Sequence, residues 1–220
     1  ANGQADRARA PLQWSTQYRL AFGQTKLGDG GIRKTDDKID LSTTLTYLAN
    51  AYVNPYVAAT LKTQFARGFD YGGPAKVAVS QFFDPAYLTQ TTGVGYQPWP
   101  ELKTRLGAGL REILTRDFTS YSDDDATAKV EKTKVDAGLE SVTEAAWHLA
   151  QNIVLSSKLE VFAPVADLDM TAVRNDTNLS LKLNEYISTN LNLQAVKDKS
   201  ASPDLQTKEA LAVGLSYTFM

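Results

Sequence analysis

Ten charged side chains fall on the polar side of alternating segments, where they could form an electrostatic site. Basic residues predominate early and acidic residues later: Arg19, Lys62, Lys103, Arg105, Arg111, Asp136, Glu140, Glu144, Lys158 and Glu160. Facing one interior, a basic arc opposite an acidic arc could set up the field of a selective pore. The alternative is structural pairing across neighbouring strands, Arg111 with Asp136 and Arg105 with Glu140 or Glu144. The sequence favours this second interpretation, a filled and structural interior.

Histidine-based hydrolysis is the enzyme class that most needs a test. A catalytic base must lie within hydrogen-bond reach of its nucleophile or water. The single histidine, His148, follows Trp147 in a predicted short turn. That position lies far from the long-loop end, so we interpret His148 as a solvated turn residue and expect no enzyme.

Metal and phosphate sites find equally little support. The acidic run at 122–125 lacks the spacing of a calcium loop, which favours a solvated external loop. The glycine-rich segment at 27–31 precedes no predicted helix, so phosphate binding at a helix start is not expected. Cysteine is absent, which excludes zinc–thiolate sites and thiol catalysis. We expect no cofactor and no metal.

The charged residues lie in predicted strands, because a strict alternation of apolar and polar residues repeats ten times along the chain. In the first segment Trp14, Tyr18 and Phe22 share one side, and Arg19 lies on the other. Many of these runs match the 9–11 residues of a tilted membrane strand. The ten segments lie near 13–22, 39–47, 57–65, 86–97, 102–111, 136–147, 155–161, 177–183, 187–194 and 210–219. The segment at 86–97 is weaker, and 77–83 is predicted as part of a loop, a short extra strand or an extension above the membrane.

The connections alternate between long and short, which is typical of bacterial membrane barrels. Long ones are predicted near 27–37, 68–85, 115–134, 164–172 and 197–207, and short ones at 51–54, 98–100, 148–152 and 184–186. Aromatic residues gather near both sets, as expected at two water–lipid boundaries. Ten strands would place both termini at the short-turn, periplasmic end.

Composition is compatible with this interpretation. Net charge is −2, which gives no electrostatic reason to expect nucleic acid. The chain is 43% hydrophobic over 220 residues, enough for one domain spanning 1–220, and it has no uninterrupted apolar stretch of helix-spanning length.

The C-terminal segment resembles the assembly signal of outer-membrane barrels, through Gly214, Tyr217 and Phe219. Four further stretches are similar to an outer-membrane family found mainly in Bacteroidetes and known as a domain of unknown function: 28–41, 62–71, 82–89 and 155–162. Its members carry about two more strands ahead of the position of Trp14. The resemblance therefore implies either a ten-strand barrel or part of a longer, twelve-strand chain.

Together these features predict an all-β, antiparallel up-and-down transmembrane β-barrel in the outer membrane of a Gram-negative bacterium. The expected function is a non-enzymatic structural or accessory subunit of a membrane assembly. The alternatives are a small, porin-like selective channel and a soluble ligand-binding barrel with the apolar side inward. Expected partners are outer-membrane lipids, the barrel-assembly machinery and other subunits of a membrane complex, but not nucleic acid.

Overall fold

Antiparallel strands account for most of the chain, as the alternating pattern predicts. The computed structural model describes all residues except 27–30, 74, 125, 185, 201, 203 and 216–220. In this part of the chain, eleven strands form one sheet in which each strand pairs with the next one along. The prediction of an all-β, antiparallel up-and-down fold is confirmed. The strands in sheet order are β1 (Asn2–Arg9), β2 (Leu12–Thr25), β3 (Arg33–Tyr47), β4 (Val53–Thr63), β7 (Ala86–Trp99), β8 (Leu102–Leu114), β9 (Thr133–Ala150), β10 (Ile153–Pro164), β11 (Ala172–Lys182), β12 (Ile187–Lys197) and β13 (Gln206–Leu215).

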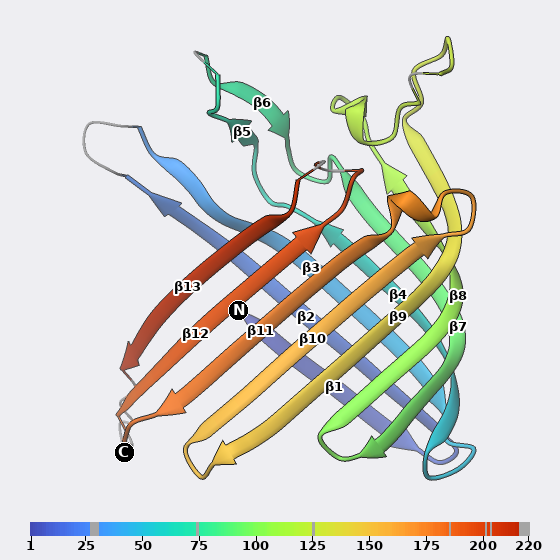
Figure 1. The fold of residues 1–220 in the computed structure, drawn as a ribbon, viewed down its shortest axis with the longest axis vertical. Helices are drawn as coiled ribbons and strands as arrows, with labels where there is room; N and C mark the ends of the chain where they lie inside the picture. Colours follow the sequence, from blue (N-terminus) through green and yellow to red (C-terminus); the bar gives the residue numbers. More distant parts are fainter. Residues whose placement is uncertain are drawn as a thin grey trace. The chain divides into compact units, whose positions relative to one another are not determined.

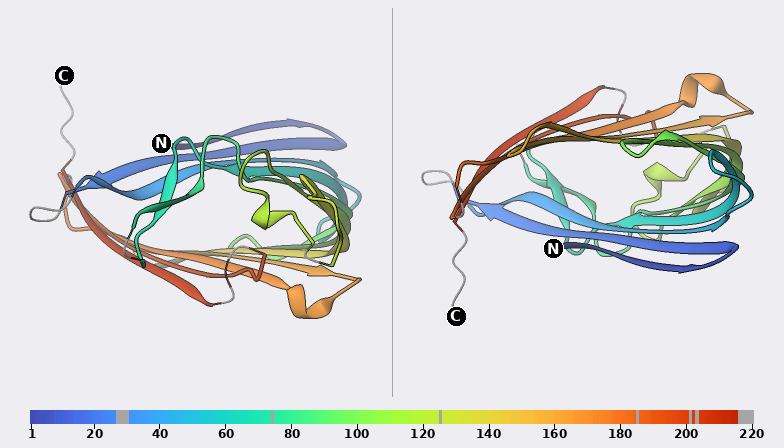
Figure 2. Two further views of the ribbon diagram at one scale, coloured as in Figure 1. Left: turned by 90° about the horizontal axis from the view of Figure 1, so that it is seen from above. Right: turned by 90° about the horizontal axis from the view of Figure 1, so that it is seen from below.

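The edge strands in this order are β1 and β13, so closure into a barrel stays a prediction. The strands also group into two compact units. The first contains Ala1–Ala49, Pro55–Thr92 and Gly109–Ala137, and the second contains Asn50–Asn54, Gly93–Ala108 and Gly138–Met220. In the first unit β1 to β4 lie side by side (Figure 1), and in the second β10 to β13 form one continuous layer (Figure 2).

The first strand was not predicted. Residues 2–9 are polar or small and lack large apolar side chains, yet they pair in register with β2 from Asn2–Arg19 to Arg9–Leu12. This strand is held by its backbone pairing with β2, although its residues show no alternation of apolar and polar side chains that would predict a strand. The expectation that Ala1 lies at the short-turn end is wrong, because its amino group donates to the carbonyl of Leu20, beyond the middle of β2.

The connections segregate by length as predicted. Short turns join β1 to β2, β7 to β8 and β9 to β10, whereas the longer segments follow β4, β8, β10 and β12. Two of the long segments contain short 3-10 helices, η1 (Thr119–Tyr121) and η2 (Leu168–Met170). The segment after β4 contains the extra short strand considered for 77–83: β6 (Val77–Ser80) pairs with β5 (Gly68–Asp70). No helix in the described residues is long and apolar enough to cross a membrane.

The two sides of the strands differ in exposure, most clearly in β7 and β8. Many large side chains of the apolar register are exposed, including Trp14 at 55%, Leu106 at 56% and Leu211 at 70%. The buried residues are few and belong mostly to the other side or to the ends of strands, such as Arg111, Ile113 and Phe162. Phe162 fits because it lies over Gly138, where an added Cβ would come within 2.7 Å of the ring. Many large apolar side chains of the sheet are therefore exposed, and the few buried residues include both apolar and polar ones.

Candidate functional site

A tight hairpin ahead of β7 is the centre of a polar network at the long-loop end of the first unit. The backbones of Gln81 and Asp84 bond to each other in both directions, with N···O distances of 2.8 and 3.1 Å. The hairpin therefore has a two-residue tip, Phe82 and Phe83, and Phe83 adopts a left-handed conformation with φ of 55°.

The Asp84 carboxylate anchors a second loop. It is 1% exposed and accepts hydrogen bonds from the backbone N–H groups of 116, 117 and 118, at 3.1, 2.8 and 3.4 Å. These groups begin the long segment after β8, whose backbone would otherwise lack strand partners. A buried carboxylate satisfied by three N–H donors acts as a fixed acceptor that shapes the loop.

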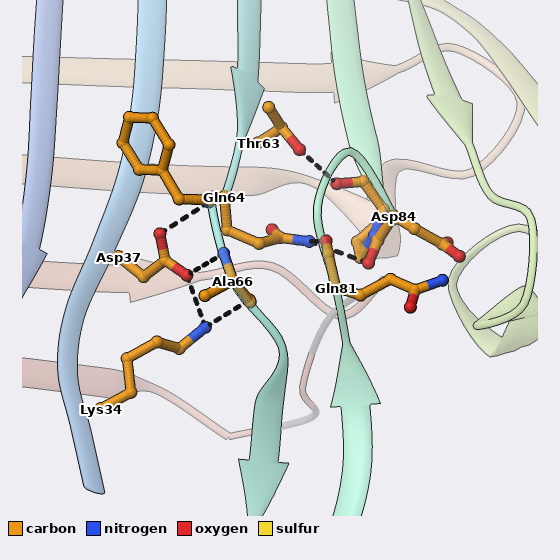
Figure 3. A network of polar contacts seen from close by, with 9 residues as sticks. Lys34, Asp37, Thr63, Gln64, Ala66, Gln81 and Asp84 are labelled. Atoms are coloured by element: carbon orange, nitrogen blue, oxygen red, sulfur yellow. Dashed lines mark hydrogen bonds and ion pairs between the residues drawn. The ribbon is translucent and has the colours of Figure 1, made fainter.

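The end of β4 holds the hairpin from its other side. The Gln64 amide donates to the carbonyl of Gln81 and to that of Asp84 at 2.8 Å, and the Thr63 hydroxyl donates to the carbonyl of Pro85 at 3.0 Å (Figure 3). Thr63 is the last residue of β4 and Gln64 is the next one, so two consecutive residues hold the hairpin. Its position is consequently fixed relative to the end of β4.

A second buried carboxylate, Asp37, turns the chain just after β4. It is 3% exposed, accepts from the backbone N–H groups of Phe65 and Ala66 at 2.7 and 2.9 Å, and pairs with the Lys34 ammonium at 2.7 Å. Lys34 also donates to the Ala66 carbonyl at 2.9 Å (Figure 3). Asp37 therefore ties the start of β3 to the segment that leads into β5.

A cavity of about 250 Å³ lies beside this second anchor. Its lining is polar and consists of Lys34, Thr35, Asp36, Asp37, Gln64 and Ser80. Because Asp37 is already occupied by an ammonium and two N–H groups, it is poorly placed to accept a proton from a substrate. Among the described residues, no group of three or more histidine, aspartate or glutamate side chains gathers as a metal site would require.

The segment between β8 and β9 contains the groups with displaced pKa values. Burial and then the charge of Asp84 raise the pKa of the Tyr121 phenol. The hydrogen bond from Gln81 is the main cause that lowers the pKa of the exposed Asp117, and the bond from Thr127 does the same for Glu131. Glu131 also accepts from the backbone N–H of Asp124, and Asp123 accepts from that of Glu131. Residues of the acidic run thus take part in the hydrogen bonds that close this loop, although residue 125 lies outside the described residues.

The structure places two of the predicted charges of the first unit around a carboxylate that sequence reasoning did not single out. Arg19 and Lys62 both lie opposite Asp40, on β2 and β4 respectively. The ammonium of Lys38 is 3.6 Å from Asp40 as well. The predicted arc of basic residues therefore includes an acidic residue, Asp40, between Arg19 and Lys62.

Arg111 is 7% exposed, and its guanidinium carbon lies 5.3 Å from the centroid of the Tyr87 ring. Asp136 has an ion pair with Lys134 on its own strand at 4.0 Å. The predicted pairs Arg111–Asp136 and Arg105–Glu140 or Glu144 stay predictions. Lys103 is an exposed residue of β8, and Glu140 lies opposite Phe162.

The second unit brings three predicted charges together. The Lys158 ammonium lies 3.8 Å from Glu144 and 3.0 Å from Glu160. In the next position across the sheet, opposite Lys158, Asp176 accepts from the amides of Asn192 and Gln194 at 2.8 and 3.0 Å. The polar side of β9 to β12 is therefore a cross-strand network rather than a row of separate charges.

Of four other predicted residues, the structure places two. His148 lies within β9 opposite Val154, not in the turn, because β9 continues to Ala150. Gly214 lies in β13 opposite Ser188, near the short-turn end. Tyr217 and Phe219 lie outside the described residues.

The two anchoring carboxylates were missed as functional residues. Asp37 and Asp84 both lie in stretches that carried the family resemblance, but an isolated aspartate in a loop has no spacing pattern. The available signal was Phe82-Phe83-Asp84-Pro85, since two adjacent aromatics beside an aspartate and a proline are unusual for a solvated loop.

The fold and the site define an all-β protein built on an up-and-down antiparallel sheet, in which buried carboxylates anchor two of the long connections. Residues 86–219, more than half of the chain, match the family described as "Protein of unknown function, DUF481", and the chain belongs to this family. Residues 1–69 match a second family, "Protein of unknown function (DUF3078)". No curated protein and no solved structure matches the chain.

Proposed function

We propose that this chain is a non-enzymatic, integral outer-membrane β-barrel protein that acts as a structural or accessory subunit of a membrane assembly. The observation that carries the proposal is the exposure of the apolar register. A soluble barrel would bury that side, because hiding apolar area from water stabilises a fold by about 25 cal/mol per Å². Here Trp14, Leu106 and Leu211 are more than half exposed.

The polar register supports the same proposal. In the second unit, the Glu144–Lys158–Glu160 and Asp176–Asn192–Gln194 groups satisfy one another across strands. Polar groups away from water need such partners, and a narrow barrel fills its interior with side chains. This arrangement favours the structural role over an open selective channel.

The loop distribution adds a third line of support. Short turns at one end and longer connections at the other are typical of bacterial membrane barrels. The stretches similar to the Bacteroidetes outer-membrane family include both anchoring carboxylates, Asp37 and Asp84. We infer that the long loops are held in shape for contact with partners outside the barrel.

The test is extraction of the expressed chain from bacterial membranes with detergent, followed by electrophoresis with and without boiling. We expect the protein in the outer-membrane fraction and a change of mobility on boiling, because a folded barrel resists the detergent until it is heated. Other subunits recovered in constant proportion would support the accessory role. Recovery in the soluble fraction would contradict the membrane assignment.

A further inference from the structure

Two phenylalanine rings are exposed at the tip of the hairpin that precedes β7. Phe82 is 60% exposed and Phe83 is 42% exposed, and their ring centroids lie 6.2 Å apart at 47°. Large apolar side chains in a loop normally fold inward, because exposure to water is unfavourable. The polar network leaves this pair outside.

The tip is held in a fixed place. Gln64 at the end of β4 binds both ends of the hairpin, and the Asp84 carboxylate binds the backbone at 116–118. Only Asp84 and Pro85 separate the tip from the first residue of β7. At roughly 3.3–3.6 Å per residue, the Cα atom of Phe83 lies within about 11 Å of the first Cα atom of β7.

The backbone conformation of Phe83 disfavours phenylalanine, so the turn by itself does not explain why an aromatic residue occupies this position. At φ of 55° a glycine or asparagine is favoured, and a bulky residue is strained. A hairpin that needed only to reverse the chain would be more stable with one of those residues. Strain that persists at an exposed aromatic points to a contact made by the ring itself.

Two arginines flank the base of the tip. The Arg67 guanidinium donates to the side-chain oxygen of Gln81 at 3.2 Å, while the nitrogen of the same amide donates to Asp117. The Arg116 side chain is 70% exposed and lies 3.3 Å from Asp117. Exposed rings beside exposed guanidiniums suit the boundary of a lipid layer, where rings enter the headgroup region and cations meet phosphates.

We propose that the Phe82–Phe83 tip, with Arg67 and Arg116, is a membrane-interface anchor that seats its rings among phosphate-bearing lipid headgroups. The inference rests on the proposed membrane function and adds a specific lipid contact to it. It accounts together for the exposure of the rings, the strain at Phe83 and the position of the hairpin at the end of the strands.

The absence of cysteine makes a direct test possible. A spin label is attached to Phe82→Cys, and the labelled protein is reconstituted in vesicles of phosphatidylcholine and phosphatidylglycerol. Collisions with oxygen, which concentrates in lipid, are compared with collisions with a water-soluble nickel complex. We expect the label to meet oxygen more than nickel. A label that meets mainly nickel, or neither reagent because protein covers it, would overturn the anchor.

A label at Leu106→Cys, on the apolar side of β8, separates this inference from the proposed function. A lipid signal at 106 with a water signal at 82 would overturn the anchor and leave the membrane assignment standing. Water signals at both positions would contradict both proposals.

The phosphate contact has its own test on the Phe82→Cys label. Introducing Arg67→Gln together with Arg116→Gln should shift the label toward nickel accessibility, because the headgroup phosphates lose their two cationic partners. A matched Lys199→Gln variant, in the segment after β12, should leave the accessibility unchanged. An equal response in all variants would overturn the role of the two arginines.

Discussion

At the scale of single residues, the most consequential groups are two carboxylates whose partners are mainly backbone. Asp37 and Asp84 are almost completely buried and together accept from five backbone N–H groups. This explains how segments without regular strand partners keep a defined course. Losing such an acceptor leaves several donors unpaired at once.

We therefore expect Asp84→Ala to destabilise the loop end of the protein by about 2–4 kcal/mol. Three N–H groups would lose their acceptor, so proteases should cut within 115–132 faster than in the wild type. Urea unfolding in detergent and timed proteolysis measure the two effects. Asp117→Ala removes an exposed carboxylate from the same region and should change both much less, because only side-chain bonds to Gln81 and Arg116 are lost. Equal behaviour of the two variants would contradict the anchoring role.

Phe83→Asn should behave in the opposite way. Asparagine tolerates the left-handed region, so the variant should be as stable as the wild type or more stable by up to about 1 kcal/mol. The same unfolding measurement checks this expectation. A loss of stability would mean that the ring contributes to packing, and the strain argument would then fail.

At the scale of elements, we expect the segment between β8 and β9 to respond to alkaline pH. Tyr121 in η1 has a raised pKa because its phenol is partly buried and Asp84 is negative nearby. The neutral phenol is therefore favoured in the folded state. Its contribution to stability is fully present below the unfolded pKa of about 10 and is lost as pH rises through the folded pKa.

Tyr121→Phe should remove that alkaline loss, because phenylalanine has no proton to release. Protease cleavage within 115–132, followed as the pH is raised above 10, measures the opening of the segment. Cleavage that accelerates equally in the wild type and in the variant would show that another group opens the loop.

The strands themselves offer a test of what surrounds them. Leu106 on β8 is 56% exposed, and Leu106→Arg should cost about 2–4 kcal/mol if that side faces the middle of a lipid layer. Val130, in the long segment, is 57% exposed, and Val130→Arg should cost less than about 0.5 kcal/mol. Refolding into vesicles measures both. Equal small effects would favour a water-exposed sheet.

At the scale of the whole molecule, the polar networks bear on conduction. Because Lys158 and Asp176 are both engaged by neighbouring side chains, we expect no steady conductance when the protein is inserted into a planar lipid bilayer. The double variant Lys158→Ala and Asp176→Ala removes the centres of both groups and is the variant in which conductance would first appear. Steady conductance of the unaltered protein would favour the channel interpretation.

The sequence alone determined the strands, their antiparallel order and the segregation of long and short connections. These features follow from local alternation, which sets the side of the sheet that each residue faces. It did not reveal β1, whose residues pair with β2 without an apolar side of their own.

Only the tertiary structure decided which charges meet. Asp40 lies between Arg19 and Lys62 because of the registers of β2, β3 and β4. The register of two paired strands depends on both of them, so neither segment determines it by itself. The hydrogen bonds that hold the Phe82–Phe83 tip likewise join residues 64, 84 and 116–118, which are far apart in the sequence. Local patterns thus specify the strands, whereas the contacts that could serve function depend on how distant strands align.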